Sequence, residues 1–144
     1  MGTSYETLYE QFLFKVKAYN LLAVELDDRI VMLKMYLNTA IARFFKLCYT
    51  DLTNRNDEEG YFENTLAPDE EDILTDLMVI AWLSPQIYSD ELLESRLNTK
   101  DFTEYSPSKL IDSIRTVYDT TTNRVRQAMI DYSYSHRDVG DISK

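Results

Sequence analysis

The sequence predicts an all-α protein, a small bundle of about five helices. Hydrophobic residues recur at spacings of three and four over most of the chain, which is the pattern of amphipathic helices. Three glycines and three prolines among 144 residues leave little material for tight hairpins or phosphate-binding loops. With 44% hydrophobic and 28% charged residues, the composition is that of a globular domain with a sizeable core. We therefore expect one helical domain at residues 1–135 and a flexible tail at 136–144.

The first two predicted helices are amphipathic. One covers about residues 4–19, where Thr3 and Glu6 have the spacing of a capping box. Its apolar side chains fall on one face, at Leu8, Phe12, Val16 and Tyr19. The other helix starts near Asp27, and its wide apolar stripe runs to Cys48. Both stripes predict helices that face a common core.

A long acidic loop is predicted at residues 50–67. Apolar residues no longer recur at helical spacing there, and the stretch is rich in Asp, Asn, Thr and Gly. Its few large apolar residues include Tyr61, Phe62 and Leu66. The stretch has room for a short extended piece. Loops of this length are usually functional or mobile.

A very apolar central helix is predicted at about residues 68–83. Pro68 suits the first helical position, and the acidic residues after it suit the positive end of the helix dipole. The run from Leu77 to Leu83 is apolar on every side, which is typical of a helix surrounded by protein. Ser84 and Pro85 are expected to end this helix, because a proline disfavours α geometry in the residue before it. A short fourth helix is expected at about residues 89–97.

A long C-terminal helix is predicted at about residues 107–134. Ser106 is its expected N-cap and Pro107 its first residue. A helix of about 25 residues spans roughly 38 Å, more than one small domain needs to close its core. Part of it is therefore expected to contact another chain or to project outward. The predicted core anchors of the whole bundle are Leu37, Phe44, Leu77, Ile80, Trp82, Ile114 and Val117.

Most of the net charge of −10 lies in one window. Residues 51–76 contain ten acidic residues and one basic residue, Arg55, so this window carries −9 of the −10. The rest of the chain has no basic stripe, which argues against autonomous nucleic-acid binding. The window suits a solvated loop and helix start, or a surface that repels DNA or meets a partner. The candidate DNA-channel or partner-facing surface comprises Asp57, Glu58, Glu59, Glu63, Asp69, Glu70 and Glu71.

No catalytic, metal or cofactor site is expected. Cys48 is the one cysteine and His136 the one histidine, so neither an internal disulfide nor a histidine-based zinc site can form. Cys48 falls on an apolar helix stripe and His136 near a helix end, so they are not expected to form a nucleophilic pair. The sequence around Gly60 does not match a calcium-binding loop, because Arg55 and Leu66 occupy positions where such a loop needs calcium ligands. The longest wholly apolar run is much too short to cross a bilayer.

Three stretches of the sequence carry a family resemblance. They are Tyr36–Phe44 in the second helix, Asp69–Pro85 with its ending Ala81-Trp82-Leu83-Ser84-Pro85, and Tyr105-Ser106-Pro107 at the start of the last helix. In these stretches and in the order of its elements, the chain resembles the small helical head-to-tail connector proteins of long-tailed double-stranded DNA bacteriophages. These are also called adaptor, neck or head-completion proteins. The resemblance covers most of residues 5–135, with a longer final helix and a longer acidic loop than the compact family form.

The resemblance implies a structural protein of the virion that is not an enzyme and takes no cofactor. Such proteins typically form a ring of twelve copies beneath the portal, extend the DNA channel and support the next neck or tail protein. We therefore expect self-association, contacts with the portal protein and with a downstream neck or tail-completion protein, and passage of DNA without sequence-specific binding. The expected location is the head–tail junction of the virion, after synthesis in the host cytoplasm and without membrane contact.

Two surfaces are expected to carry these contacts. An acidic surface that faces the channel would repel passing DNA. The patternless tail is expected to dock on the portal, with aromatic side chains of the kind enriched at interfaces. The candidate portal-docking residues are Tyr132, Tyr134, His136, Arg137, Val139 and Ile142. The two tyrosines suit ordinary positions of an amphipathic helix equally well.

An alternative function uses the same acidic window. A small acidic helical protein can bind a host or phage protein as a DNA mimic, a regulator or an anti-defence factor. Mimicry needs acidic side chains arrayed over one face, whereas most of these lie in one loop and one helix start. The placement of the acidic residues in the fold therefore discriminates between the two functions.

Overall fold

Helices dominate the structure, a computed structural model that describes residues 2–18, 30–97 and 107–142. Within these ranges there are four helices and one small antiparallel sheet, so the chain is mostly helical as predicted, with four helices in place of about five. The elements in chain order are α1 (Tyr5–Ala18), α2 (Ile30–Phe44), β1 (Arg55–Asn56), β2 (Tyr61–Phe62), α3 (Pro68–Leu97) and α4 (Pro107–Ile142).

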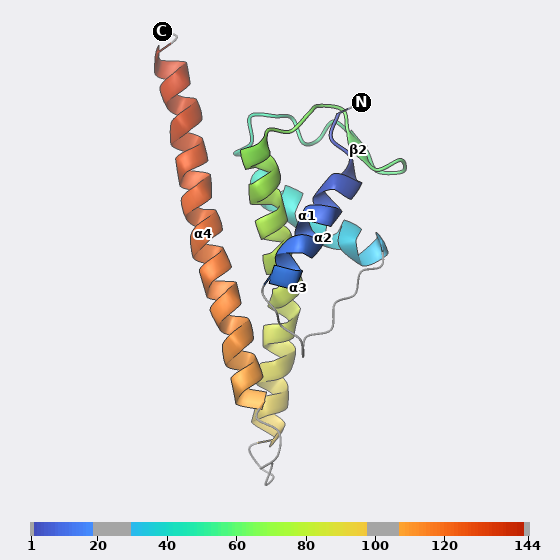
Figure 1. Cartoon of the computed structure of the whole chain (residues 1–144), viewed down its shortest axis with the longest axis vertical. Helices are drawn as coiled ribbons and strands as arrows, with labels where there is room; N and C mark the ends of the chain where they lie inside the picture. The colour runs from blue at the N-terminus through green and yellow to red at the C-terminus, as the bar shows by residue number, and fades with distance from the viewer. Residues whose placement is uncertain (1, 19–29, 98–106, 143–144) are drawn as a thin grey trace.

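Helix α3 contacts each of the other three helices (Figure 1). It runs antiparallel to α4, while α1 and α2 lie against its N-terminal half. Eight consecutive residues, 73–80, are buried in this position. Six of the predicted core anchors are buried, namely Leu37, Phe44, Leu77, Ile80, Trp82 and Ile114. Val117 is only half-buried against the same core.

The prediction that α3 ends near Leu83 is wrong, because the helix continues through Pro85 to Leu97 and includes the expected short fourth helix. Proline at position 85 removes the N–H that would donate to the carbonyl of Ala81. Nearby, the Ser84 hydroxyl donates to the carbonyl of Ile80 at 2.9 Å. Packing along α4 outweighs the one missing backbone hydrogen bond, since most helical stability in proteins comes from tertiary packing.

Helix α4 is also longer than predicted. It has 36 residues and ends at Ile142, so residues 136–142 are helical and the predicted flexible tail is wrong over that range. Residues 143–144 lie outside the described part of the chain. The C-terminal end of α4 projects past the start of α3 (Figure 1). A helix of this length spans roughly 54 Å at 1.5 Å per residue.

The predicted acidic loop contains an ordered hairpin. Strands β1 and β2 pair antiparallel, and Gly60 adopts a left-handed φ of 79° in the turn between them. The N-terminal segment lies along β2, since the Gly2 N–H donates to the Phe62 carbonyl and the Phe62 N–H donates to the Thr3 carbonyl, both at 2.8 Å. Phe62 is buried, so the hairpin is fastened to the core.

The ends of the first two helices differ slightly from the prediction. Ser4, not Thr3, caps α1, because the Ser4 hydroxyl accepts from the Glu6 N–H at 3.1 Å. The Thr3 hydroxyl accepts instead from the Leu66 N–H across the fold. Helix α2 ends at Phe44, four residues before Cys48, and the predicted start of α2 at Asp27 lies outside the described residues, as does the predicted N-cap Ser106.

Candidate interaction surfaces

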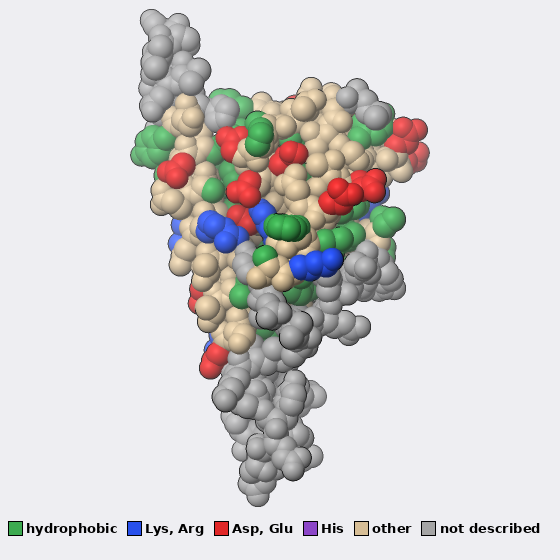
Figure 2. All heavy atoms as spheres, in the orientation of Figure 1, with side chains coloured by type: hydrophobic (Ala, Val, Ile, Leu, Met, Phe, Trp, Pro, Cys, Tyr) green, Lys and Arg blue, Asp and Glu red, His purple; other side chains and the backbone are tan. Residues whose placement is uncertain are grey.

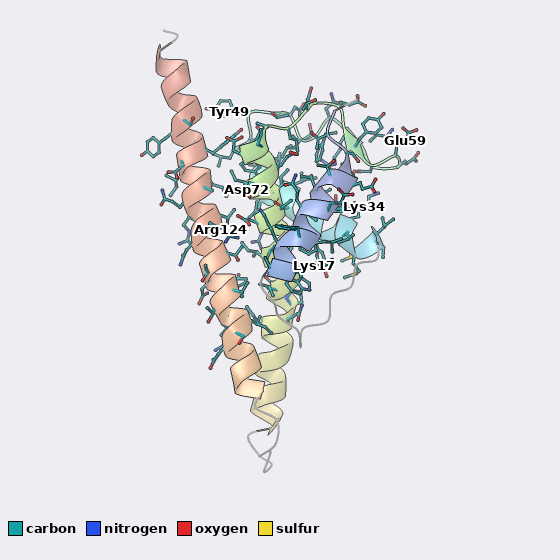
Figure 3. The ribbon with its side chains drawn as sticks, in the orientation of Figure 1. Lys17, Lys34, Tyr49, Glu59, Asp72 and Arg124 are labelled. Atoms are coloured by element: carbon teal, nitrogen blue, oxygen red, sulfur yellow. The ribbon has the colours of Figure 1, made fainter. Side chains whose placement is uncertain are left out.

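The predicted acidic surface is divided between two places in the fold. Asp57, Glu58 and Glu59 lie in the exposed turn of the hairpin, and Figure 3 shows Glu59 at the edge of the molecule away from α4. Glu63 follows β2 and is also exposed, whereas Asp69 is exposed at the start of α3. On the face seen in Figure 2, acidic side chains gather over the upper half. The window therefore makes an acidic hairpin edge and an acidic helix start.

Glu70 does not belong to this surface, because it is 2% exposed. One carboxylate oxygen accepts hydrogen bonds from the Thr50 hydroxyl and the Ala67 N–H, each at 2.8 Å. The other accepts from the Tyr132 hydroxyl at 2.7 Å, the Cys48 thiol at 3.1 Å and the Thr50 N–H at 3.4 Å. Five donors thus surround one buried carboxylate. The prediction that Glu70 faces a partner is wrong, and its neighbour Glu71 is half-buried beside Gln11.

The Glu70 cluster joins three parts of the fold: the segment after α2, the start of α3 and the C-terminal half of α4. Tyr132, predicted to dock on the portal, is 3% exposed and also accepts from the Tyr49 N–H at 2.8 Å. Its ring packs edge-to-face on Phe44 at 5.3 Å between centroids. Tyr132 therefore fastens α4 to the bundle and is not free to bind a partner.

Burial and hydrogen bonding set the protonation states of the cluster. Burial disfavours the charged form of Glu70, but the donors from Ala67, Tyr132 and Thr50 outweigh it and hold the pKa of Glu70 below its ordinary value. Burial, together with the hydrogen bond to Glu70, raises the pKa of the Cys48 thiol to about 12. The pKa of Tyr132 is raised for the same two reasons. Cys48 is therefore a protonated, unreactive thiol at neutral pH.

Acid is expected to destabilise the wild-type protein more steeply than the Glu70→Gln variant. The stabilisation from a carboxylate with a lowered pKa is fully present above the ordinary glutamate value of 4.5 and is lost as the pH falls through the lower value of the folded protein. Thermal unfolding followed by circular dichroism between about pH 7 and pH 3 measures both proteins. Parallel pH curves for the two proteins would contradict an ionised Glu70.

A second buried carboxylate, Asp76, links α1, α3 and α4. It is 1% exposed and pairs with Lys15 Nζ at 3.0 Å and with Arg124 Nη2 at 2.8 Å. Lys15 also pairs with Asp72 at 2.7 Å. Figure 3 shows Asp72 and Arg124 on facing sides of α3 and α4. These pairs explain how a buried run can include a charged residue, since a buried charge needs a partner.

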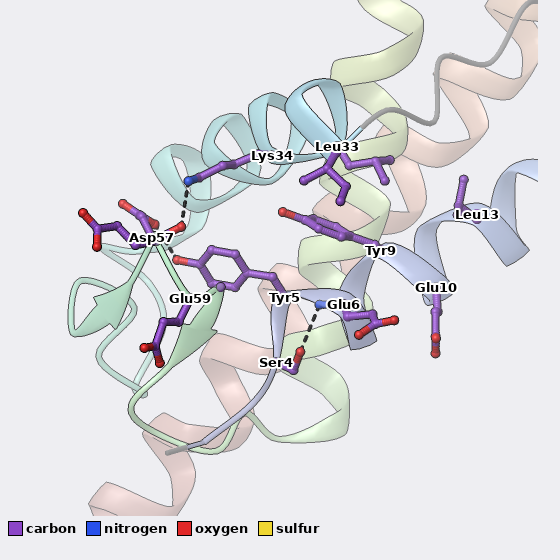
Figure 4. A pocket seen from close by; sticks show the side chains of 13 residues that line it. Ser4, Tyr5, Glu6, Tyr9, Glu10, Leu13, Leu33, Lys34, Asp57 and Glu59 are labelled. Carbon is purple, nitrogen blue, oxygen red and sulfur yellow. Dashed lines mark hydrogen bonds between the residues drawn. The ribbon is translucent and has the colours of Figure 1, made fainter.

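The hairpin turn is held against α1 and α2 around an open cavity of about 570 Å³ (Figure 4). The Tyr5 hydroxyl donates to Asp57 at 2.6 Å, and Lys34 Nζ donates to the Asp57 carbonyl at 2.7 Å. The hydrogen bond from Tyr5 lowers the pKa of Asp57, and burial followed by that hydrogen bond raises the pKa of Tyr5. Asp57 is therefore an anchor of the hairpin as well as part of its acidic edge.

A groove of about 460 Å³ runs between α2, α3 and α4. Its floor is mostly apolar and includes Leu77, Ile80 and Val125. The charged residues that line it are two arginines, Arg43 from α2 and Arg126 from α4, and no carboxylate lines it. Both arginines are exposed. This groove is a basic concave surface on an otherwise acidic protein.

Large apolar side chains are exposed on three helices and in the segment after α2. They are Phe14, Ile30, Val31, Met35, Phe45, Tyr49, Ile130 and Tyr134. Tyr134, a predicted docking residue on α4, is 58% exposed. The remaining docking candidates, His136, Arg137, Val139 and Ile142, belong to the final turns of α4, where side chains lie outside the described part of the structure.

No group of three or more His, Cys, Asp or Glu side chains among the described residues is arranged to hold a metal ion. No helix in the described ranges is long and apolar enough to cross a membrane.

Neither the groove nor the Glu70 cluster is predicted by the sequence pattern. Both depend on residues that are far apart in the chain, such as Cys48 and Tyr132. One local signal for the cluster does exist, because Tyr132 follows Val125 by seven residues and so lies on the buried seam of α4.

The fold and these surfaces define a small helical bundle with a projecting C-terminal helix, an acidic hairpin edge and a basic, apolar groove. No family model, curated protein or solved structure matches the chain.

Proposed function

We propose that this chain is a structural protein of the neck of a long-tailed DNA bacteriophage, where copies form a ring beneath the portal and extend the DNA channel. The observation that carries the proposal is helix α4, which reaches roughly 54 Å and projects beyond the bundle (Figure 1). A bundle of this size does not need such a helix to close its own core. The projecting end is available for contacts with the portal protein or with a downstream neck protein.

In this proposal α3 is the central helix and the surfaces around it have different partners. Closed rings of identical subunits use two different surfaces on each subunit, one for each neighbour. The groove and the exposed apolar residues supply surfaces of unlike chemistry on one molecule. The acidic hairpin edge, with Glu58 and Glu59, faces the channel and repels the phosphates of passing DNA.

The distribution of acidic residues supports a connector over a DNA mimic. A mimic needs its carboxylates arrayed over one continuous face. Here Glu70 and Asp76 are buried, and Asp57 is hydrogen-bonded to Tyr5 at the hairpin. Two of the ten acidic residues are therefore inside the fold, and the exposed ones are divided between the loop that contains the hairpin and the start of α3.

Native mass measurement of the purified protein at high concentration, followed by negative-stain imaging, tests the proposal. We expect closed rings of about twelve subunits, with a mass near 200 kDa for chains of 16.9 kDa. If the protein is monomeric alone, co-expression with a portal protein should recruit it into rings on the portal. A stable dimer, or no ring in either experiment, contradicts the proposal.

A further inference from the structure

Two hollows on either side of α4 are lined by opposite charge: the groove by Arg43 and Arg126, and a hollow beside the start of α3 by Asp69, Asp72 and Asp131. Arg126 and Asp131 are five residues apart, which places them about 140° apart around a helix of 3.6 residues per turn. Both side chains are exposed, and the buried residue Val125 lies about 100° from Arg126 and about 120° from Asp131, on the remaining arc of the helix. Arg126 therefore borders the groove beside α2, and Asp131 borders the opposite flank of α4.

The basic flank is concave and has an apolar floor. Along α4 the lining of the groove extends from Tyr118 to Ser133, roughly 22 Å of helix. Ile130, 43% exposed, also lines it. Within the described part of the chain, neither Arg43 nor Arg126 forms an ion pair with a carboxylate. The groove thus offers two guanidinium groups and an apolar surface to an acidic partner.

The acidic flank lies where α4 faces the start of α3. A shallow hollow of about 320 Å³ is bordered there by three carboxylates, those of Asp69, Asp72 and Asp131. Asp72 is already paired with Lys15, whereas Asp69 and Asp131 are exposed at its rim. The small side chains Ala128 and Ser135 also line this flank and leave room for a close approach.

Charge complementarity favours a second copy of this chain as the partner that occupies the groove. The protein carries a net charge of −10, so two copies repel each other in most orientations. Placing the acidic flank of one copy against the arginine-lined groove of the next replaces repulsion by attraction. The two surfaces lie on different sides of one molecule, so the contact is head-to-tail and repeats from copy to copy.

We propose that the groove lined by Arg43 and Arg126 receives the acidic flank of a neighbouring copy, formed by Asp69 at the start of α3 and Asp131 of α4. This inference rests on the proposed ring function and names the contact that builds the ring. Ile130 and the apolar floor of the groove supply the buried area, and the arginine–carboxylate pairs set orientation and register. The hairpin edge stays outside this contact and remains free to face the channel.

Charge reversal with complementation tests the contact in the full-length protein. One double variant is Arg43→Glu with Arg126→Glu, and the other is Asp69→Lys with Asp131→Lys. Each variant alone should assemble about tenfold more weakly than the wild type or worse, because like charges meet at every contact. An equimolar mixture should assemble again, because each reversed surface then meets its reversed counterpart. Native mass spectrometry should show the two variants in equal numbers in the mixed rings.

A matched control changes the same amount of charge elsewhere. Glu58→Lys with Glu59→Lys alters the exposed hairpin turn and should leave assembly unchanged. Melting temperatures close to that of the wild type show that each variant is folded. If wild-type rings form and both reversed variants still assemble, or if the mixture of folded variants does not, this contact is wrong while the ring function stands. If the wild type forms no ring, alone or with the portal protein, the proposed function itself fails.

Discussion

Replacing Glu70 with alanine is expected to lower the free energy of unfolding by about 3–5 kcal/mol. The variant leaves five donors without their acceptor in a buried site, including the Tyr132 hydroxyl of α4 and the Ala67 N–H at the start of α3. For a chain of this size such a loss corresponds to about 10 °C or more in melting temperature. Denaturant titration and thermal unfolding at neutral pH measure it.

Three variants show whether the loss comes from the buried network. Glu70→Gln retains an acceptor of the same shape and should cost less than alanine. Tyr132→Phe removes one of the five donors and should cost about 1 kcal/mol. Glu58→Gln changes an exposed glutamate and should stay within about 0.5 kcal/mol of the wild type. A Glu70→Ala protein as stable as Glu58→Gln would contradict the buried network.

Replacing Trp82 with alanine should also cost about 3–5 kcal/mol, because it leaves a large cavity in the core. Trp82 is 3% exposed and packs edge-to-face on Phe12 of α1, with 6.3 Å between ring centroids and an angle of 85°. Its indole therefore joins α3 to α1. Urea unfolding monitored by circular dichroism measures the change.

The chain offers two informative comparisons for Trp82. The indole N–H is buried and finds no acceptor among the described residues, so Trp82→Phe loses no hydrogen bond and should cost about 1 kcal/mol. Phe14→Ala removes an aromatic side chain that is 75% exposed on α1 and should change stability by no more than about 0.5 kcal/mol. An equal loss for Trp82→Ala and Phe14→Ala would show that Trp82 is not a core residue.

Helix boundaries illustrate where local sequence signals fail. Pro85 is a strong local signal for a helix end, and it misled the prediction because packing between α3 and α4 continues past it. Helix α4 also continues to Ile142, beyond the last residues with a clear apolar period and past the start of α3 (Figure 1). Long-range packing therefore accounts for the length of α3, whereas the last turns of α4 project beyond it.

The acidic window illustrates the same limit for the surface. From the sequence alone, Glu70 resembles the exposed acidic residues beside it, and Tyr132 resembles Tyr134. In the fold Glu70 and Tyr132 meet at 2.7 Å, although 62 positions separate them, while Asp69 and Tyr134 remain exposed. The charge of a residue and its position in a helix do not show which carboxylate accepts a hydrogen bond from a donor in another helix.

The helical class of this protein, the positions of most of its helices and most of its core side chains were predictable from the amino-acid sequence. Those features follow from the spacing of apolar residues, which is a local property. The fold as a whole sets which polar residues are buried, how far α3 extends past Pro85 and where the arginine-lined groove and the acidic hollow lie. Each of these depends on groups brought together from distant parts of the chain, because a buried charge is stable only where its partners converge on it.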